Sequence, residues 1–190
     1  TGERRLLRDG HPVHHHLGVS GFATHAVVDR RSVVPVPADV PAEVASLLGC
    51  AVLTGGGAVI NAGRPRRGDT VIVVGLGGVG MAAVLTALSH DDVRVIGVDQ
   101  LPAKLELVRT MGAHAAYTPD EARDAGVKAA VVIEAVGHPK AVETAVEVTA
   151  AGGRTGFVGV PRPGRRTTPA PVGLSAVGRY AARHTAGPPV

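Results

Sequence analysis

The sequence predicts an α/β fold built on a Rossmann-type parallel sheet with about five recognisable strands, and three observations support this prediction. First, residues 70–74 read TVIVV, a β-branched apolar run typical of a strand buried on both faces of a parallel sheet. Second, this run leads into GLGGVG at 75–80, which fits G-x-G-x-x-G, and then into the helix-forming stretch MAAVLTAL at 81–88. Third, a second apolar run at 93–98, VRVIGV, ends at Asp99. Strand, glycine turn, helix, strand and acid in this order predict a dinucleotide-binding βαβ unit.

The glycines of this turn have separate physical roles. Gly75 allows the tight turn, Gly77 lets the backbone approach a pyrophosphate, and Gly80 lets the helix pack closely on the strand. The helix that follows presents free N–H groups and the positive end of its dipole to the phosphates. Glycine is common in this chain, with 26 residues, so the order of the surrounding elements carries much of the prediction. The candidate cofactor-binding residues of the turn are Gly75, Leu76, Gly77, Gly78, Val79 and Gly80.

Asp99 is the candidate ligand of the cofactor ribose. It follows the last glycine of the turn by close to the roughly 20 residues expected for the acid that binds a ribose 2′-OH. A carboxylate repels a 2′-phosphate, so this residue favours NAD over NADP as the cofactor. The alternative is a βαβ unit that binds nothing, in which Asp99 only caps the helix that begins near Pro102.

Composition bounds the possible partners. Every Asp and Glu lies at or before Glu147, while six arginines follow it, so the net charge of +4 belongs to the C-terminal part of the chain. Aromatic residues make up only 2% of the sequence, which argues against a stacking surface for nucleic acid. The lone Cys50 and the absence of an apolar leader in TGERRLLRDG favour a cytoplasmic protein. The stretches 45–63 and 70–89 are uncharged and long enough to span a membrane, but their glycines favour buried elements of a soluble protein.

The N-terminal part has weaker patterns. Residues 1–17 are polar and rich in histidine, which is consistent with a loop or with metal binding. Residues 20–37 predict two short strands with a turn at Asp29, and a helix is expected from Pro41. If Cys50 is helical, it shares a face with the residue four positions later, although a lone cysteine is more often a small core residue.

Beyond Asp99, helical and strand-like segments continue to alternate. The expected elements are a helix over 102–110 closed by Gly112, a strand over 115–117, a strand over 129–136, a crossover helix over 140–149 and a fifth strand over 154–160. After Pro161 the pattern decays into a tail without acids that is rich in Pro, Arg, Gly and Ala. Such a composition predicts disorder.

Four segments in order resemble one known family. They are HHHLGVSGFATHAVVDRRSVVPVP, LLGCAVLTGGGAVINAG, GDTVIVVGLGGVG and VIGVDQLPAKLELVRTMGAH, and they resemble the zinc-type alcohol dehydrogenases of the medium-chain dehydrogenase/reductase family. The resemblance runs from about His14 to about Pro161. It implies that Cys50 is a ligand of the catalytic zinc and that Thr54 lies against the nicotinamide, as a catalytic and cofactor-binding residue.

The resemblance also implies the remaining site residues. The substrate cleft is lined by His16 and Leu17. Lys104 lies near the adenosine ribose, and Ala135 and Val136 flank the adenosine. The residues expected to approach the nicotinamide are Val158, Gly159 and Val160.

The resemblance divides the chain into three parts. We expect residues 1–48 to be a remnant of a β-rich GroES-like catalytic domain, 49–161 to be the Rossmann domain, and 162–190 to be a disordered or aberrant tail. The implied function is NAD-dependent, zinc-assisted interconversion of an alcohol and an aldehyde or ketone, in a homo-oligomeric parent. Because the other zinc ligands are expected in an N-terminal segment absent from this sequence, the chain alone is expected to be inactive. The alternatives are a non-catalytic NAD-binding fragment and a zinc-free quinone-reductase-like member, the latter disfavoured by Cys50.

Overall fold

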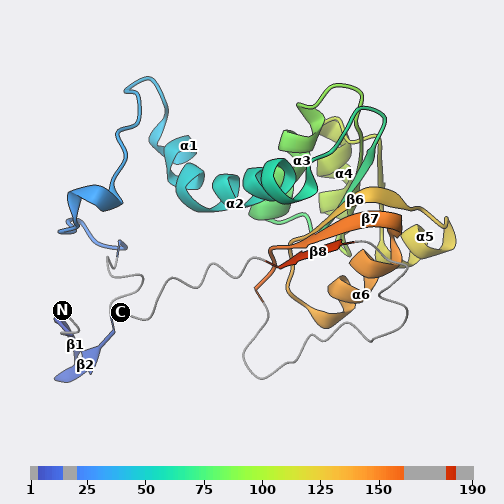
Figure 1. Ribbon diagram of the computed structural model, residues 1–190. Coiled ribbons are helices and arrows are strands. Elements are labelled where there is room, and N and C mark those ends of the chain that lie inside the picture. The colour runs from blue at the N-terminus through green and yellow to red at the C-terminus, as the bar shows by residue number, and fades with distance from the viewer. Residues whose placement is uncertain (1–3, 15–20, 161–178, 183–190) are drawn as a thin grey trace. The chain divides into compact units, whose positions relative to one another are not determined.

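The computed structural model describes residues 4–14, 21–160 and 179–182, the last of these by their backbone alone (Figure 1). The chain divides into two compact units, Thr1–Ala42 with Ala186–Val190 and Glu43–Thr185. The sequence placed the first boundary a few residues later, after residue 48.

The first unit contains a short antiparallel hairpin. Strand β1 (Leu6–Arg8) pairs with β2 (His11–Val13). The two residues between them, Asp9 and Gly10, both have positive φ, 51° and 77°, which is the backbone of a type I′ turn. The turn therefore matches the right-handed twist of the strands it joins.

The prediction of two strands over 20–37 is wrong. Residues 21–41 contain one regular element, the 3₁₀ turn η2 (Arg30–Ser32). Asp29 caps this turn by accepting a 2.9 Å hydrogen bond from the N–H of Arg31. Almost all side chains of the described part of this segment are exposed. An apolar alternating pattern forms a strand only where a neighbouring strand and a core complete it, and the described residues supply neither here.

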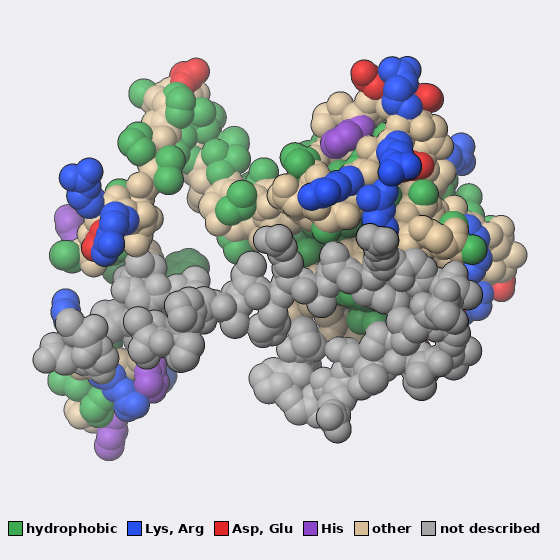
Figure 2. Space-filling model, in the orientation of Figure 1, with side chains coloured by type: hydrophobic (Ala, Val, Ile, Leu, Met, Phe, Trp, Pro, Cys, Tyr) green, Lys and Arg blue, Asp and Glu red, His purple; other side chains and the backbone are tan. Residues whose placement is uncertain are grey.

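The second unit begins with a continuous helical segment. It consists of α1 (Ala42–Leu47), η3 (Leu48–Val52), α2 (Leu53–Gly57) and η4 (Ala58–Gly63), of which η3 and η4 are π-helical. Over its 22 residues it is long and apolar enough to cross a membrane by length and composition, yet only 22% of its most apolar window is buried. Figure 2 shows hydrophobic side chains along α1, and Leu47 and Leu53 are 55% and 68% exposed. The expectation that the stretch 45–63 is buried is therefore wrong for its first half, 45–53, whereas its second half contains the buried residues Gly55, Gly56, Ala58, Val59 and Gly63.

A six-stranded parallel sheet forms the centre of the second unit (Figure 1). Its strands are β3 (Thr70–Val74), β4 (Arg94–Val98), β5 (Ala115–Tyr117), β6 (Ala129–Glu134), β7 (Thr149–Phe157) and β8 (Arg179–Ala182). The spatial order is β5-β4-β3-β6-β7-β8. The Rossmann-type sheet is confirmed, and β8 is an addition to it, because it pairs with β7 from within the tail expected to be disordered.

Helices connect the strands on both faces. They are α3 (Gly78–Leu88), α4 (Pro102–Thr110), α5 (Pro119–Asp124) and α6 (Pro139–Glu147). Helices α3, α4 and α6 were expected within a few residues, whereas α5 was not. Helix α5 is short and begins with a capping box, in which Thr118 and Glu121 exchange side-chain to backbone hydrogen bonds.

Two apolar layers hold the sheet. Alternate residues of β3 face opposite sides, so Val71 and Val73 pack in one layer, and Ile72 and Val74 pack in the other. All four are at least 97% buried. Both layers consist mainly of Val, Ile, Leu and Ala, as the low aromatic content predicted.

The sheet reverses its winding between two neighbouring strands. From β3 the chain continues to β4 and β5 at one edge of the sheet, and from β6 it continues to β7 towards the opposite edge. Strands β3 and β6 pair directly at the centre. In open parallel sheets, such a point leaves a crevice at the carboxyl ends of the strands, where ligands bind. The glycine turn and Glu134 lie at these ends.

Candidate functional site

The glycine turn lies at the carboxyl end of β3, as predicted. Gly75 has a φ of 92° and donates a 2.8 Å hydrogen bond to the carbonyl of Val98, which ties the turn to the neighbouring strand. A Cβ on Gly80 would collide with the carbonyl of Gly75, so the first turn of α3 packs directly on the turn's backbone. By contrast, within the described residues no atom beyond the two chain neighbours lies within 4 Å of the position of a Cβ on Gly77. The backbone is therefore close-packed at Gly80 and open at Gly77.

The N-terminus of α3 begins at this open position. Gly77 is the N-cap residue, with extended backbone and no side chain to bond the free N–H groups of the first turn. Its carbonyl accepts the first hydrogen bond of the helix, from Met81 at 2.8 Å. An α-helix leaves its first N–H groups without intrahelical partners, and these groups are suited to an anion.

Asp99 lies beside the turn. One carboxylate oxygen, Oδ2, accepts a 2.8 Å hydrogen bond from the N–H of Leu76, and Oδ1 accepts one of 3.0 Å from the N–H of Leu101. The Asp99 side chain is 12% exposed, and the Nζ of Lys104 lies 3.8 Å from Oδ2. Each of the two predictions for Asp99 therefore matches one contact. The bond to Leu76 places the carboxylate at the predicted cofactor site, and the bond to Leu101, the N-cap residue of α4, fits a role at the start of that helix.

The loops after β6 and β7 complete the same end of the sheet. The N–H of Ala135 donates to the carbonyl of Val74 at 2.9 Å, and a Cβ on Gly75 would collide with the side chain of Val136. The N–H of Val158 donates to the carbonyl of Glu134 at 2.9 Å. The structure thus brings together the turn, Asp99, Lys104 and both loops predicted to face the cofactor.

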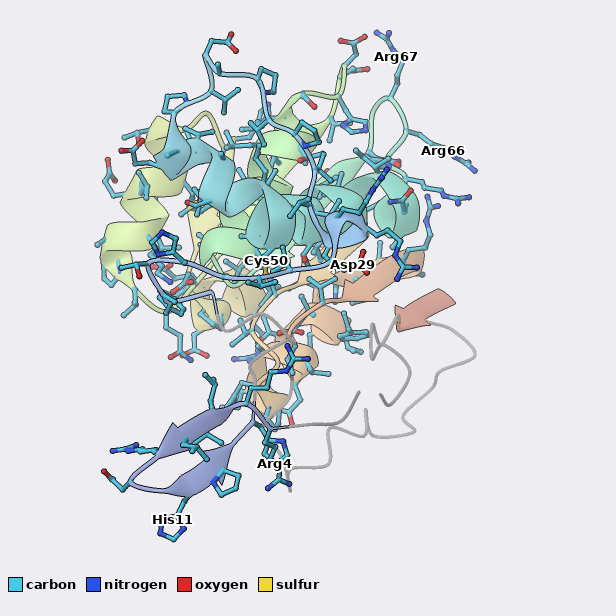
Figure 3. All side chains as sticks on the ribbon, turned by 90° about the vertical axis from the view of Figure 1, so that its left-hand side faces the viewer. Arg4, His11, Asp29, Cys50, Arg66 and Arg67 are labelled. Carbon is cyan, nitrogen blue, oxygen red and sulfur yellow. The ribbon has the colours of Figure 1, made fainter. Side chains whose placement is uncertain are left out.

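The helical segment carries Cys50, the predicted zinc ligand, and Thr54, which is predicted to lie against the nicotinamide. It crosses α3 closely, because a Cβ on Gly55 would lie 2.8 Å from the nitrogen of Ala83. Thr54 is partly buried at this crossing. Cys50 is exposed on η3, so the reading of this cysteine as a core residue is wrong (Figure 3).

The described residues contain one of the predicted metal ligands. Within residues 4–14 and 21–160, no three His, Cys, Asp or Glu side chains gather as a metal site. A zinc site in an enzyme takes three protein ligands and an open position, so Cys50 alone does not complete one. The predicted substrate residues, His16 and Leu17, lie outside the described residues.

Sequence reasoning missed Glu134 at this site. This fully buried acid ends β6, and its Oε1 accepts hydrogen bonds from the N–H groups of Val136 at 2.8 Å and Gly137 at 2.7 Å. Burial raises the pKa of the Glu134 carboxyl, and the N–H groups of Gly137, Val136 and Gly159 oppose this rise. The signal in the sequence was a single acid within the otherwise apolar run AAVVIEAV.

These features define a class of protein. A parallel sheet, a glycine turn open at a helix N-terminus and a carboxylate at the end of the next strand are the parts of a dinucleotide-binding domain.

Comparisons with known proteins identify the family. The sequence profile of zinc-binding dehydrogenases matches residues 78–180. The S-(hydroxymethyl)glutathione dehydrogenase of Synechocystis is 32% identical over 184 residues, which cover 91% of this chain and 50% of that protein. Alcohol dehydrogenase 1 of Trifolium repens is 34% identical over 170 residues, covering 83% of this chain and 44% of its own. The crystal structure of benzyl alcohol dehydrogenase from Acinetobacter calcoaceticus superposes with a TM-score of 0.72 at 29% identity, over 79% of this chain and 43% of that one.

The chain belongs to the zinc-binding dehydrogenase family. This confirms the resemblance to zinc-type alcohol dehydrogenases that the sequence indicated. The chain spans about half the length of the curated relatives it matches.

Proposed function

We propose that this chain is the cofactor-binding part of an NAD-dependent, zinc-assisted oxidoreductase that interconverts an alcohol and an aldehyde or ketone. The observation that carries the proposal is the position of the Asp99 carboxylate, hydrogen-bonded to the backbone of the glycine turn. The similar alcohol dehydrogenases support the substrate class.

The residues of the chain have distinct roles in binding the dinucleotide. The free N–H groups at the start of α3, next to Gly77, bind the pyrophosphate. Asp99 accepts from a ribose hydroxyl, since each carboxylate oxygen that bonds one backbone N–H keeps a second acceptor site. Lys104 places a positive charge beside this carboxylate. Together they orient the adenosine half of the cofactor.

The nicotinamide half requires residues from two other elements. In the proposal, Thr54 and the loop from Val158 to Val160 contact the nicotinamide, while Ala135 and Val136 flank the adenosine. Cys50 is one zinc ligand, His16 and Leu17 line the substrate cleft, and the further zinc ligands are not among the described residues. Zinc, when bound, polarises the alcohol oxygen as a Lewis acid.

A second candidate function is NAD binding without metal chemistry. It is favoured because no three His, Cys, Asp or Glu side chains gather as a metal site among the described residues. Under either candidate we expect a cytoplasmic protein with no nucleic-acid or membrane partner, and under the first a homo-oligomeric enzyme. Both candidate functions use the same cofactor site, but only the first includes a catalytic zinc.

The experiment that tests the proposal has two parts. Titration of the purified 190-residue chain with NADH is expected to give saturable binding of one molecule per chain, displaced by AMP. Absence of binding would contradict both candidates. In a longer form of the protein that holds zinc, alcohol-dependent NADH formation that a chelator abolishes supports the first candidate, and NADH binding without turnover supports the second.

A further inference from the structure

Glu134 is a buried acid whose place in the fold needs an explanation. It is the last residue of β6, in register with Val74 of β3 on one side and Phe157 of β7 on the other, and its exposed fraction is 0%. None of the ion pairs within the described residues includes it. A carboxyl group in such a position destabilises the fold unless its hydrogen bonds compensate. An apolar residue would therefore suit the strand better if packing alone mattered.

The residue connects two loops. Its side-chain Oε1 accepts from the N–H groups of Val136 and Gly137, which fixes the turn after β6. Its backbone carbonyl accepts from the N–H groups of Val158 at 2.9 Å and Gly159 at 3.2 Å, which fixes the start of the loop after β7. Both loops are thus bonded to the same residue, one through its side chain and one through its main chain.

The two loops touch through their backbones. A Cβ on Gly137 would lie 2.7 Å from the nitrogen of Val160, and a Cβ on Gly159 would lie 2.7 Å from the Cα of Gly137. Contacts this short leave no room for a side chain at either glycine. The relative position of the loops therefore depends on the residue that bonds them both.

The second carboxylate oxygen of Glu134 is not used by the first loop. Oε2 is buried and has no hydrogen-bond partner among the described residues. The N–H of Gly159 bonds the main-chain carbonyl of Glu134, so among the described residues the hydrogen bonds of the carboxyl group go to the first loop. The side chain of Glu134 therefore positions the first loop directly, and it reaches the second loop through the backbone contact between Gly137 and Gly159.

We propose that Glu134 is a positioning residue that sets the loop 135–137 against the loop 158–160, and so joins the adenosine and nicotinamide halves of the cofactor site. This role rests on the proposed function, since it assigns the first loop to the adenosine and the second to the nicotinamide. Glu134 acts through the backbone of the loops, since its carboxyl group holds the first loop and its main-chain carbonyl holds the second.

The test compares two Glu134 variants by their affinities for AMP, which occupies the proposed adenosine half of the site, and for NADH, which occupies both halves. Glu134→Gln keeps a side-chain oxygen that can accept from the N–H groups of Val136 and Gly137. Both AMP and NADH are therefore expected to bind Glu134→Gln within about twofold of the wild-type affinity. Glu134→Ala removes this acceptor and is expected to weaken the binding of both by about tenfold, the effect of losing a charged hydrogen bond.

A matched control is Thr149→Val. It removes a buried hydroxyl that bonds Ala145 and Thr155, away from the loops, and is expected to lower the unfolding midpoint without changing either affinity. Hydrogen exchange of the wild type adds a measurement that needs no variant, in which the amides of Gly137 and Gly159 are expected to be protected because both bond Glu134. Wild-type NADH affinity in Glu134→Ala, or unprotected amides at Gly137 and Gly159 in the wild type, would overturn the proposal. If the positioning role of Glu134 is overturned but the wild type binds AMP and NADH, the proposed function still stands. If the wild type binds neither AMP nor NADH, the positioning role and the proposed function are both overturned.

Discussion

The carboxylate of Asp99 accepts a 2.8 Å hydrogen bond from the backbone N–H of Leu76, a residue 23 positions earlier in the chain. This bond joins the carboxyl end of β4 to the glycine turn after β3. The same side chain therefore supports the turn and presents acceptor positions beside it. Asp99 therefore serves both the stability of the turn and the proposed recognition of the cofactor ribose.

The first prediction concerns stability. Asp99→Ala leaves the N–H of Leu76 without its acceptor, and an unsatisfied group in a nearly buried position costs about 1–3 kcal/mol. Urea denaturation followed by circular dichroism measures the loss. The control is Asp91→Ala at an exposed position, for which a change within about 0.5 kcal/mol is expected. Equal stability of the two variants would contradict the role of the bond.

The second prediction separates two glycines of the turn. Gly80→Ala is expected to unfold or strongly destabilise the chain, because the new Cβ would collide with the carbonyl of Gly75. The new Cβ of Gly77→Ala meets no atom of the described part of the chain within 4 Å beyond its chain neighbours, so the stability of this variant is expected to stay within about 1 kcal/mol of wild type. Its NADH affinity is expected to fall, because the Cβ occupies the space proposed for the pyrophosphate. A folded Gly77→Ala that binds NADH as wild type does would refute this placement.

The third prediction is a pH dependence that belongs to Glu134. Burial raises its pKa in the folded state above the ordinary value of 4.5, so the folded protein holds this proton more tightly than the unfolded chain. Its contribution to stability is therefore present below pH 4.5 and is lost as the pH rises through the folded-state pKa, with a slope of up to about 1.4 kcal/mol per pH unit.

Glu134→Gln removes this titration. The difference in unfolding free energy between wild type and the variant is expected to shift in favour of glutamine as the pH rises above 4.5. Carboxylates with lowered pKa values, such as Glu121 and Asp29, act with the opposite sign and cancel in the difference. A difference that does not change with pH would show that the Glu134 carboxyl has an ordinary pKa.

The fourth prediction concerns zinc. In a longer form of the protein that holds zinc, Cys50→Ser is expected to lose the metal and most turnover but to bind NADH nearly as before, since thiolate is a strong zinc ligand and serine stays protonated. Thr54→Ala, the matched control, is expected to keep zinc and to bind NADH more weakly. Metal analysis beside NADH titration measures both effects. Full zinc content in Cys50→Ser would exclude this cysteine as a ligand.

The sequence predicted those parts of the fold that depend on local periodicity. The apolar runs ending at Val74 and Val98 are strands, and the expected partnership of the glycine turn with Asp99 is a direct contact. Three glycines, a helix-forming stretch and an acid at the usual offset leave few other folds for that segment.

The parts that were missed depend on contacts distant in sequence. The edge strand β8 forms by pairing with β7, and its sequence RYAA carries no strand pattern of its own. Glu134 occupies a buried strand end because its carboxyl group bonds the loop that follows, which no apolar pattern predicts. Helix α5 had a readable signal, since Thr118 and Glu121 form a capping box around Pro119. Two strands expected over 20–37 did not form because that pattern has no partner strand in the described residues.

The central claim is that Asp99 makes this domain a site for NAD, and the ratio of NADH to NADPH affinity tests it most directly. The ratio, measured by fluorescence titration of one protein with both cofactors, is insensitive to any change in folding stability. Wild type is expected to bind NADH more tightly, and Asp99→Ala is expected to narrow the difference by about 1–3 kcal/mol. Equal or tighter binding of NADPH by the wild type would contradict the claim.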